Sequence, residues 1–253
     1  MTEPELHFAL TIALFVLAVP TFAALMWTTA PYGRHLRDGW GPTLPSRLGW
    51  VLMECPAVLL FGAVFFAGRH RFEIAPLVLL GLWQLHYVHR TFVFPFRMRI
   101  AGKRISLTVV ALGMLFNGIN AYVNARWISG FGSYPSAWLT DPRFLAGAAV
   151  FAAGLAINLH SDTVLISLRK PGESGYKIPH GGLYRWVSSP NYLGEIVEWL
   201  GWAILTWSLP GLAFAVYTTA NLAPRAIANH RWYREKFPGE YPPERRALIP
   251  WLL

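Results

Sequence analysis

The sequence predicts an all-α, polytopic integral membrane protein with about seven transmembrane helices. Composition, hydropathy and the placement of basic residues lead to that prediction. Hydrophobic residues make up 54% of the 253 residues and charged residues only 14%, whereas a soluble domain carries roughly 25% charged residues. Apolar stretches of about 20 residues, enough to cross ~30 Å of hydrocarbon, recur along the chain. We therefore expect one membrane domain over residues 1–253.

Each expected span is an apolar run of roughly membrane-spanning length. Pro20, Pro56 and Pro76 lie inside or at the start of spans, which bilayer helices tolerate when neighbouring helices satisfy the freed carbonyl groups. In chain order, the expected spans are Leu6–Trp27, Leu48–Ala67, Ile74–Phe94, Ile105–Asn124, Phe144–Leu168, Tyr192–Leu209 and Leu212–Ala228.

Basic residues are distributed unevenly between the loops, and cytoplasmic loops of membrane proteins are enriched in Lys and Arg. Most of the 22 Lys and Arg residues lie in the loops at 31–47, 97–104 and 169–190 and in the segment from residue 225 onward. The loops between these hold only Arg69, Arg71, Arg126 and Arg143. We therefore expect the N-terminus outside and the C-terminus in the cytoplasm.

The second and third spans carry ionisable side chains at membrane depth, where such groups cost a few kcal/mol. Glu54 stands among apolar neighbours, so we favour a functional role for it together with Tyr87. His86 and Arg90 are four residues apart and share one face of the third span. For His86 and His89, a hydrogen-bonded structural role is the preferred interpretation.

Polar residues also follow helical spacing in the next three spans. The fourth span carries Asn117, Asn120 and Asn124, for which interhelical amide bonding and a functional role are equally open. The fifth span ends in Asn158–Asp162. The sixth begins with three polar residues on one side of the helix: Asn191, Glu195 and Glu198.

Several classes of protein are excluded. The single cysteine, Cys55, allows neither an internal disulfide nor a cysteine-based metal site. The histidines lack the spacing of a zinc-binding HExxH helix, so we expect no metal. The net charge of +9 resides in loops between apolar segments, which indicates membrane topology and not nucleic-acid binding.

Several motifs, in order along the chain, resemble those of the steroid 5α-reductases. They are Leu85–Val93, Asn158–Asp162, Leu168–Glu173, Gly175–Leu183, Ser189–Glu195 with Glu198–Trp199, Arg225–Ala226, His230–Tyr233 and Arg246–Pro250. The resemblance implies an integral-membrane enzyme that uses NADPH to reduce the 4,5 double bond of a 3-oxo-Δ4 steroid. It also implies a seven-helix fold whose cofactor-binding half is residues 105–253.

The resemblance further implies that Glu54 and Tyr87 address the steroid's 3-oxo group. Family members have a glutamine just before that glutamate, whereas this chain has Met53, a difference that bears on substrate preference. Trp50, Met53 and Met114 are expected to contact the substrate along with them. A hydroxyl donor in a dry site stabilises negative charge developing on the 3-oxygen, and a desolvated carboxyl group can stay protonated and donate directly or orient the phenol.

The cofactor requires cations and hydrogen-bond partners on one side, because the chain has no strand-to-helix GxGxxG motif. Arg169 and Arg225 are candidates for pairing with phosphate groups. The full set expected to bind NADPH is Arg90, Asn158, Asp162, Arg169, Tyr176, Asn191, Glu195, Arg225, Asn229 and Tyr233.

Two other functions stay open. Residues 182–186 with 189–192 also resemble the carboxyl-terminal motif of isoprenylcysteine methyltransferases, which use S-adenosylmethionine. The second alternative is a channel or a lipid-binding site lined by the polar residues. The expected partners are a steroid or sterol-like substrate and membrane lipid, with no nucleic acid and no obligate protein partner. The Ala-, Trp- and Arg-rich composition favours a bacterial inner membrane over the endoplasmic reticulum, with the cofactor site facing the cytoplasm.

Overall fold

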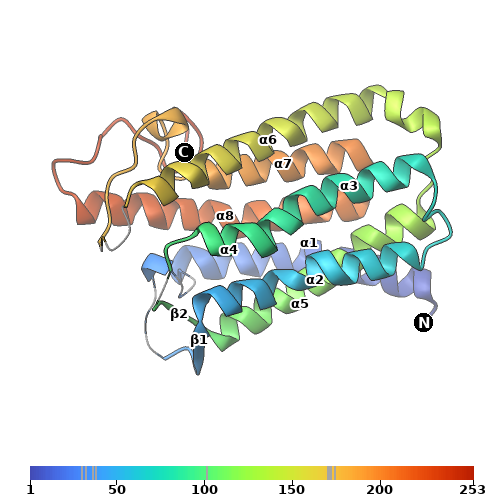
Figure 1. Ribbon diagram of the computed structural model, residues 1–253, viewed down its shortest axis with the longest axis horizontal. Coiled ribbons are helices and arrows are strands. Elements are labelled where there is room, and N and C mark those ends of the chain that lie inside the picture. Colours follow the sequence, from blue (N-terminus) through green and yellow to red (C-terminus); the bar gives the residue numbers. More distant parts are fainter. Residues whose placement is uncertain are drawn as a thin grey trace.

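The computed structural model describes residues 1–29, 31, 33–35, 37, 39–100, 102–169, 173 and 175–253, and it is mostly helical (Figure 1). Its α-helices are α1 (Glu3–Trp27), α2 (Ser46–Phe66), α3 (Ile74–Val88), α4 (Phe94–Arg97), α5 (Leu107–Arg126), α6 (Pro142–Ser167), α7 (Pro190–Thr206) and α8 (Leu209–Lys236). Short 3₁₀ turns cover Gly33–His35, Ser136–Thr140 and Gly182–Arg185, and two π turns cover His89–Val93 and Trp127–Phe131.

Within the described residues, four helices are long and apolar enough to cross a membrane. They are α1, α2, α6 and α5 with the π turn that follows it. The helices α3 and α7 are shorter, with 15 and 17 residues, and α8 carries a polar carboxyl-terminal part. The apolar character of a membrane protein is therefore present, and the count of seven spans stays a prediction.

Some helices begin or end at residues other than those expected from the sequence. Ile105 lies in a strand and not in a helix, so α5 begins at Leu107. The helix α8 extends to Lys236, beyond the end that hydropathy indicated, because its last turns are polar and lie outside the apolar run.

The third expected span is interrupted at its end by the π turn at His89–Val93. Pro95 lacks a backbone N–H, and within an α-helix its ring would clash with the carbonyl group of Thr91. The chain adopts a wider turn instead, in which the backbone N–H of Phe94 donates to the carbonyl oxygen of His89. This change of register lies directly beside Arg90, and such π turns are frequent at functional sites.

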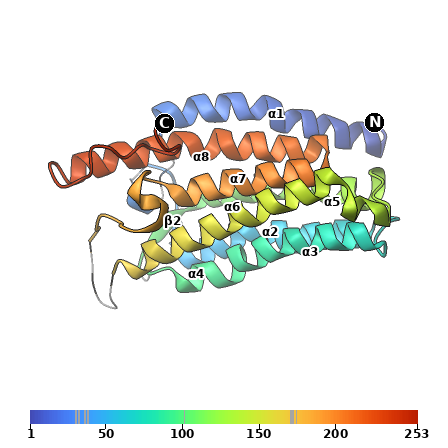
Figure 2. The same cartoon turned by 90° about the horizontal axis from the view of Figure 1, so that it is seen from above.

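The basic loops lie together at one end of the bundle. The short antiparallel strands β1 (Thr43–Pro45) and β2 (Arg104–Ser106) join the first two of these loops, with Leu44 paired to Ile105. The N-terminus lies toward the other end (Figure 1). Figure 2 shows α1 outermost beside α8, with α3 on the opposite side of the molecule.

The helices α6 and α7 pack backbone to backbone because glycines face the partner helix. A side chain at Gly154 would collide with the backbone of Glu198, and one at Gly201 would collide with the backbone of Phe151. Small residues allow such close approach between membrane helices, where van der Waals packing replaces the hydrophobic effect. This contact fixes the polar ends of α6 and α7 relative to each other.

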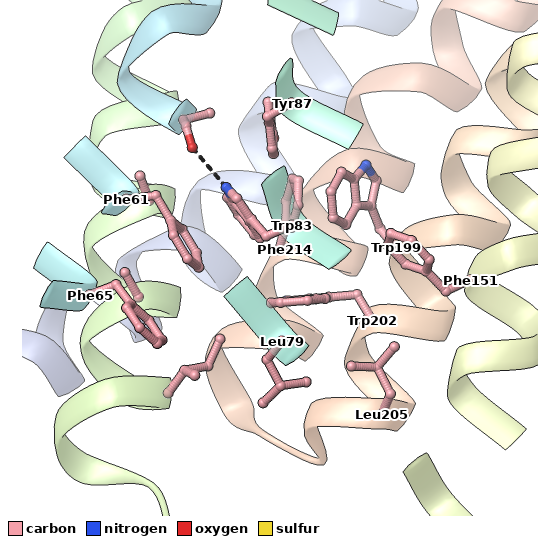
Figure 3. Close-up of a cluster of buried hydrophobic side chains, with 14 of the residues drawn as sticks. Phe61, Phe65, Leu79, Trp83, Tyr87, Phe151, Trp199, Trp202, Leu205 and Phe214 are labelled. Carbon is pink, nitrogen blue, oxygen red and sulfur yellow. Dashed lines mark hydrogen bonds between the residues drawn. The ribbon is translucent and has the colours of Figure 1, made fainter. Parts of the chain in front are cut away.

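A cluster of buried aromatic side chains forms the centre of the bundle (Figure 3). Trp83 is its middle member and donates a hydrogen bond from Nε1 to the carbonyl oxygen of Ala57, 2.8 Å away. Trp199, Trp202 and Phe214 surround it, with ring centroids 5.2–5.5 Å from that of Trp83. The cluster supports Tyr87, which stacks on Trp199 at the edge of the candidate site.

Candidate active site

Two adjoining cavities lie between the helices, and they share Trp50, Arg90 and Leu222. The inner cavity has a volume of about 140 Å³ and is lined from α2, α3, α5, α7 and α8. The outer cavity, of about 270 Å³, lies on the side of the basic loops. The two cavities therefore meet at a shared wall formed by these three residues.

The inner cavity contains the acid and the phenol expected at the substrate. Glu54 and Tyr87 both line it, although Glu54 is only 8% exposed and Tyr87 only 4%. The Asn117 amide donates to Glu54 Oε2 at 3.2 Å and to the carbonyl oxygen of Met53 at 2.8 Å. One asparagine of the polar stripe on α5 therefore positions the carboxyl group.

The other two asparagines of that stripe bond to each other, and Asn124 also links α5 to another helix. The Asn124 amide donates to the side-chain oxygen of Asn120 at 3.0 Å, and Trp202 Nε1 donates to the Asn124 side chain at 3.0 Å. The stripe thus contains one asparagine beside Glu54 and two bonded to each other, and a functional role for Asn117 stays a prediction.

The expected substrate contacts separate into two groups. Trp50 and Met53 line the inner cavity, and Met53 fills the space left by the missing side chain of Gly113. Met114 is 37% exposed and lies outside the linings of both cavities, because the side chains of adjacent helical residues point in different directions. Gly113 takes the place in the lining at which Met114 was expected.

Arg90 lies where the two cavities meet. Its guanidinium nitrogens are 3.5 Å from Asp162 Oδ2 and 3.4 Å from Glu195 Oε2. The guanidinium carbon lies 4.9 Å from the ring centroid of Trp50, and Trp50 Nε1 donates to the Arg90 carbonyl oxygen. These contacts hold Arg90 against both carboxylates at the boundary between the cavities.

The polar ends of α6 and α7 form a short network next to Arg90. Asn191 donates to Asp162 Oδ1 at 3.0 Å. Asn158, which was expected to bind cofactor, donates to the carbonyl oxygen of Asn191 at 3.0 Å and lines neither cavity. Asn158 therefore acts on the site through Asn191, and Glu195 lines the inner cavity and not the outer one.

The outer cavity gathers the remaining residues of the predicted cofactor set. Arg169, Tyr176, Arg225, Asn229 and Tyr233 line it together with Asp162 and Asn191. Arg225 Nη2 lies 3.4 Å from the Tyr192 hydroxyl, to which it donates a hydrogen bond. Of the motif around Arg169, Lys170, Pro171 and Gly172 lie outside the described residues.

Several lining residues were not expected from the sequence, among them Arg34, His35 and Lys103. The Arg34 guanidinium lies among the rings of Tyr176, Trp232 and Tyr233, at 4.6–5.6 Å from their centroids. His35 Nε2 lies 3.1 Å from Asn229 Oδ1, and Lys103 Nζ lies 5.5 Å from the Tyr176 ring. All three stand in loops whose charges had indicated topology alone.

The cations of the outer cavity repel one another. Burial, together with the charges of Arg169 and Arg34, holds the pKa of Lys103 below its usual value. Burial likewise lowers the pKa of His35. In addition, Arg34 Nη1 is buried without a hydrogen-bond partner among the described residues. An anion placed here would relieve the repulsion and supply the missing acceptor.

Comparison with known proteins gives the family. The sequence model of the family described as 3-oxo-5-alpha-steroid 4-dehydrogenase matches residues 103–253. Steroid 5-alpha-reductase DET2 of Gossypium hirsutum is 43% identical to this chain, over 97% of the chain and 96% of its own length. The chain belongs to the 3-oxo-5-alpha-steroid 4-dehydrogenase family.

Further relatives extend the match across kingdoms. Steroid 5-alpha-reductase DET2 of Arabidopsis thaliana is 44% identical, over 92% of this chain and 91% of its own length. The 3-oxo-5-alpha-steroid 4-dehydrogenase 1 of Bos taurus is 43% identical, over 94% of this chain and 93% of its own length. This member of the family is thus an oxidoreductase acting on CH–CH bonds. The near-complete match favours the reductase over the methyltransferase, whose resemblance was confined to residues 182–192.

Among the described residues of this family member, no group of three or more His, Cys, Asp or Glu side chains is arranged to hold a metal ion. His86 instead pairs with Glu198, and His89 lies 3.5 Å from a nitrogen of Arg97.

Proposed function

We propose that this protein reduces the 4,5 double bond of a 3-oxo-Δ4 steroid with NADPH, with the steroid in the inner cavity and the cofactor in the outer one. The observation that carries the proposal is the junction at Arg90 between a cavity that holds an acid–phenol pair and a cavity surrounded by cations. The names of the relatives give the reaction class.

The inner cavity supplies the electrostatics that the reaction needs. Reduction of a conjugated enone develops negative charge on the 3-oxygen. The Tyr87 hydroxyl donates a hydrogen bond to that oxygen, and Glu54, held by Asn117, donates beside it or orients the phenol. Preorganised donors in a site without water are among the largest contributions to catalysis.

The outer cavity fits the dinucleotide. NADPH carries several negative charges, and Arg34, Lys103 and Arg169 lie around one tyrosine ring, that of Tyr176. The buried Arg34 Nη1 is available to donate a hydrogen bond to a phosphate oxygen. Asn191 and Asn229 offer amide groups for ribose and base. When bound, the cofactor supplies the hydride, and the protein contributes position and electrostatics.

The arrangement in the membrane follows from the basic loops. Seven spans with the N-terminus outside would place the connections at 31–47, 97–104 and 169–190 in the cytoplasm, where NADPH is available. The gathering of these loops at one end of the bundle supports that orientation (Figure 1). Composition favours a bacterial inner membrane.

Cofactor binding is the first test. We expect NADPH to raise the thermal unfolding temperature of the detergent-purified protein by several degrees, because a ligand that binds the folded state alone stabilises it. S-adenosylmethionine should leave the temperature unchanged. No shift at saturating NADPH, or a shift with S-adenosylmethionine alone, would overturn the assignment.

Turnover is the second test. The purified protein with NADPH and progesterone or testosterone should yield the saturated 3-ketone, detected by mass spectrometry. A protein that binds NADPH but reduces no member of a panel of 3-oxo-Δ4 steroids would contradict the proposed substrate class.

A further inference from the structure

A second buried acid–base pair lies beside Tyr87, and the proposed polarisation of the ketone does not use it. His86 Nδ1 on α3 lies 2.9 Å from Glu198 Oε1 on α7, with side chains 4% and 0% exposed. The His86 ring contacts those of Tyr87 and Trp199 edge to face, at centroid distances of 4.9 and 4.7 Å. His86 lines the inner cavity, whereas Glu198 does not.

The geometry of this pair gives the two nitrogens of the imidazole different roles. Because Nδ1 is bonded to Glu198, Nε2 is the ring nitrogen left for the cavity. A carboxylate that accepts from Nδ1–H stabilises the imidazolium form and fixes the ring orientation. The pair is therefore able to carry one proton at the wall of the inner cavity.

Reduction of a carbon–carbon double bond needs such a proton. As the hydride bonds to carbon 5, the electron pair of the 4,5 double bond moves onto carbon 4 and the 3-oxygen. A proton must then bond to carbon 4 to complete the saturated ketone. In the proposed function Glu54 and Tyr87 are engaged with the 3-oxygen, so carbon 4 has no assigned donor.

The other charged groups of the inner cavity are already engaged. Arg90 on α3 is held by Asp162 and Glu195, and Glu195 on α7 is thereby paired. On α2, Glu54 accepts from Asn117 of α5. The remaining titratable group of the lining is the Tyr217 phenol on α8.

We propose that His86, held by Glu198, is the catalytic residue that donates the proton to carbon 4. This assignment rests on the proposed function. The proton leaves Nε2 of the imidazolium, the N–H electron pair stays on the nitrogen, and a new C–H bond forms from the electron pair on carbon 4. His86 becomes neutral with Nδ1–H still bonded to Glu198, and water restores the proton after the product leaves.

The test uses the reverse of this step. A group that delivers a proton to carbon 4 must also remove one from carbon 4 of the saturated 3-ketone. We would incubate the purified protein with NADP⁺ and a saturated 3-oxo-5α-steroid in D₂O and measure deuterium at carbon 4 by mass spectrometry and NMR. The native protein should exchange this hydrogen faster than buffer alone.

Two variants and one matched control define the expected pattern. H86Q should lose about 10²-fold or more of the carbon 4 exchange, the usual contribution of a general acid or base. E198Q keeps an acceptor for Nδ1–H but removes the charge, so exchange should fall while the α3–α7 link remains. H89Q, which changes a histidine outside both cavities, should exchange at the native rate.

The outcomes separate the claims. Carbon 4 exchange at the native rate in H86Q or in E198Q would overturn the role of His86. If H86Q loses enone reduction but keeps this exchange, His86 only positions other groups, and the role is likewise overturned. If H86Q fails to fold, judged by its thermal shift with NADPH, E198Q decides the question. A native protein that does not reduce the enone contradicts the proposed function itself, and one that reduces it but shows no exchange above buffer contradicts only the proton donor.

Discussion

Polar side chains in the bundle fall into two kinds: those bonded to other protein groups between helices and those that face a cavity. Asn120 and Asn124 bond to each other and Asn124 bonds to Trp202 of another helix, whereas Glu54 and Tyr87 line a cavity. A polar group that links helices contributes stability, and one that lines a cavity contributes recognition or chemistry. The two kinds of residue should therefore respond differently to substitution.

Removing either donor at the 3-oxygen should reduce turnover without loss of the fold. We expect E54Q and Y87F to lose ~10²–10³ in kcat, the usual cost of one oxyanion donor. Their thermal shift with NADPH should match that of the native protein. E235Q, on an exposed part of α8, and Y122F, whose hydroxyl faces Glu3, serve as controls. Parental turnover in both E54Q and Y87F would show that the roles assigned to them are wrong.

Arg34, a loop residue whose contacts the sequence alone does not predict, should contribute to cofactor binding. R34A removes from the outer cavity a guanidinium whose Nη1 is buried, and a charge-assisted hydrogen bond contributes about 1.5–3 kcal/mol. We expect the Kd for NADPH, measured by fluorescence, to rise about 10-fold or more, with the KM for steroid changed less. R37A is the matched control, because Arg37 lies outside both cavities. An equal effect of R34A and R37A would argue against a specific phosphate contact.

Among the elements, α6 and α7 pack backbone to backbone, and this contact positions the network that ends at Arg90. The π turn at the end of α3 contributes from the other side, since it positions Arg90 after the helix register has changed. The site thus depends on the separation of two helices as well as on its own side chains.

Gly154 tests that dependence. In G154A, the added methyl group would meet the backbone of Glu198, and overpacking of this kind costs about 1–3 kcal/mol. We expect a lower unfolding temperature and weaker NADPH binding. G81A, also within a helix but with open space around it, should be neutral or slightly stabilising. If G154A and G81A unfold at the same temperature, the close α6–α7 contact is not important for stability.

At the scale of the whole molecule, the sequence predicts the apolar helices and the family, because hydropathy and ordered motifs are local properties. It does not predict which side chains converge. Arg34 is far in sequence from Tyr176 and Tyr233, and the rotation of α5 that brings Gly113 and not Met114 to the cavity depends on packing with α2. The π turn was likewise missed, since an apolar run hides a one-residue change of register.

The two-cavity arrangement predicts which carbon atom of the steroid receives the hydride of NADPH. Transfer of an isotope label from the cofactor tests that prediction. The protein should be given NADPH labelled with deuterium on the transferred hydrogen, together with a 3-oxo-Δ4 steroid in ordinary water. The account predicts one deuterium at carbon 5 of the saturated ketone and ordinary hydrogen at carbon 4, as read by NMR. Label at another carbon, or reduction with no label transferred, would contradict it.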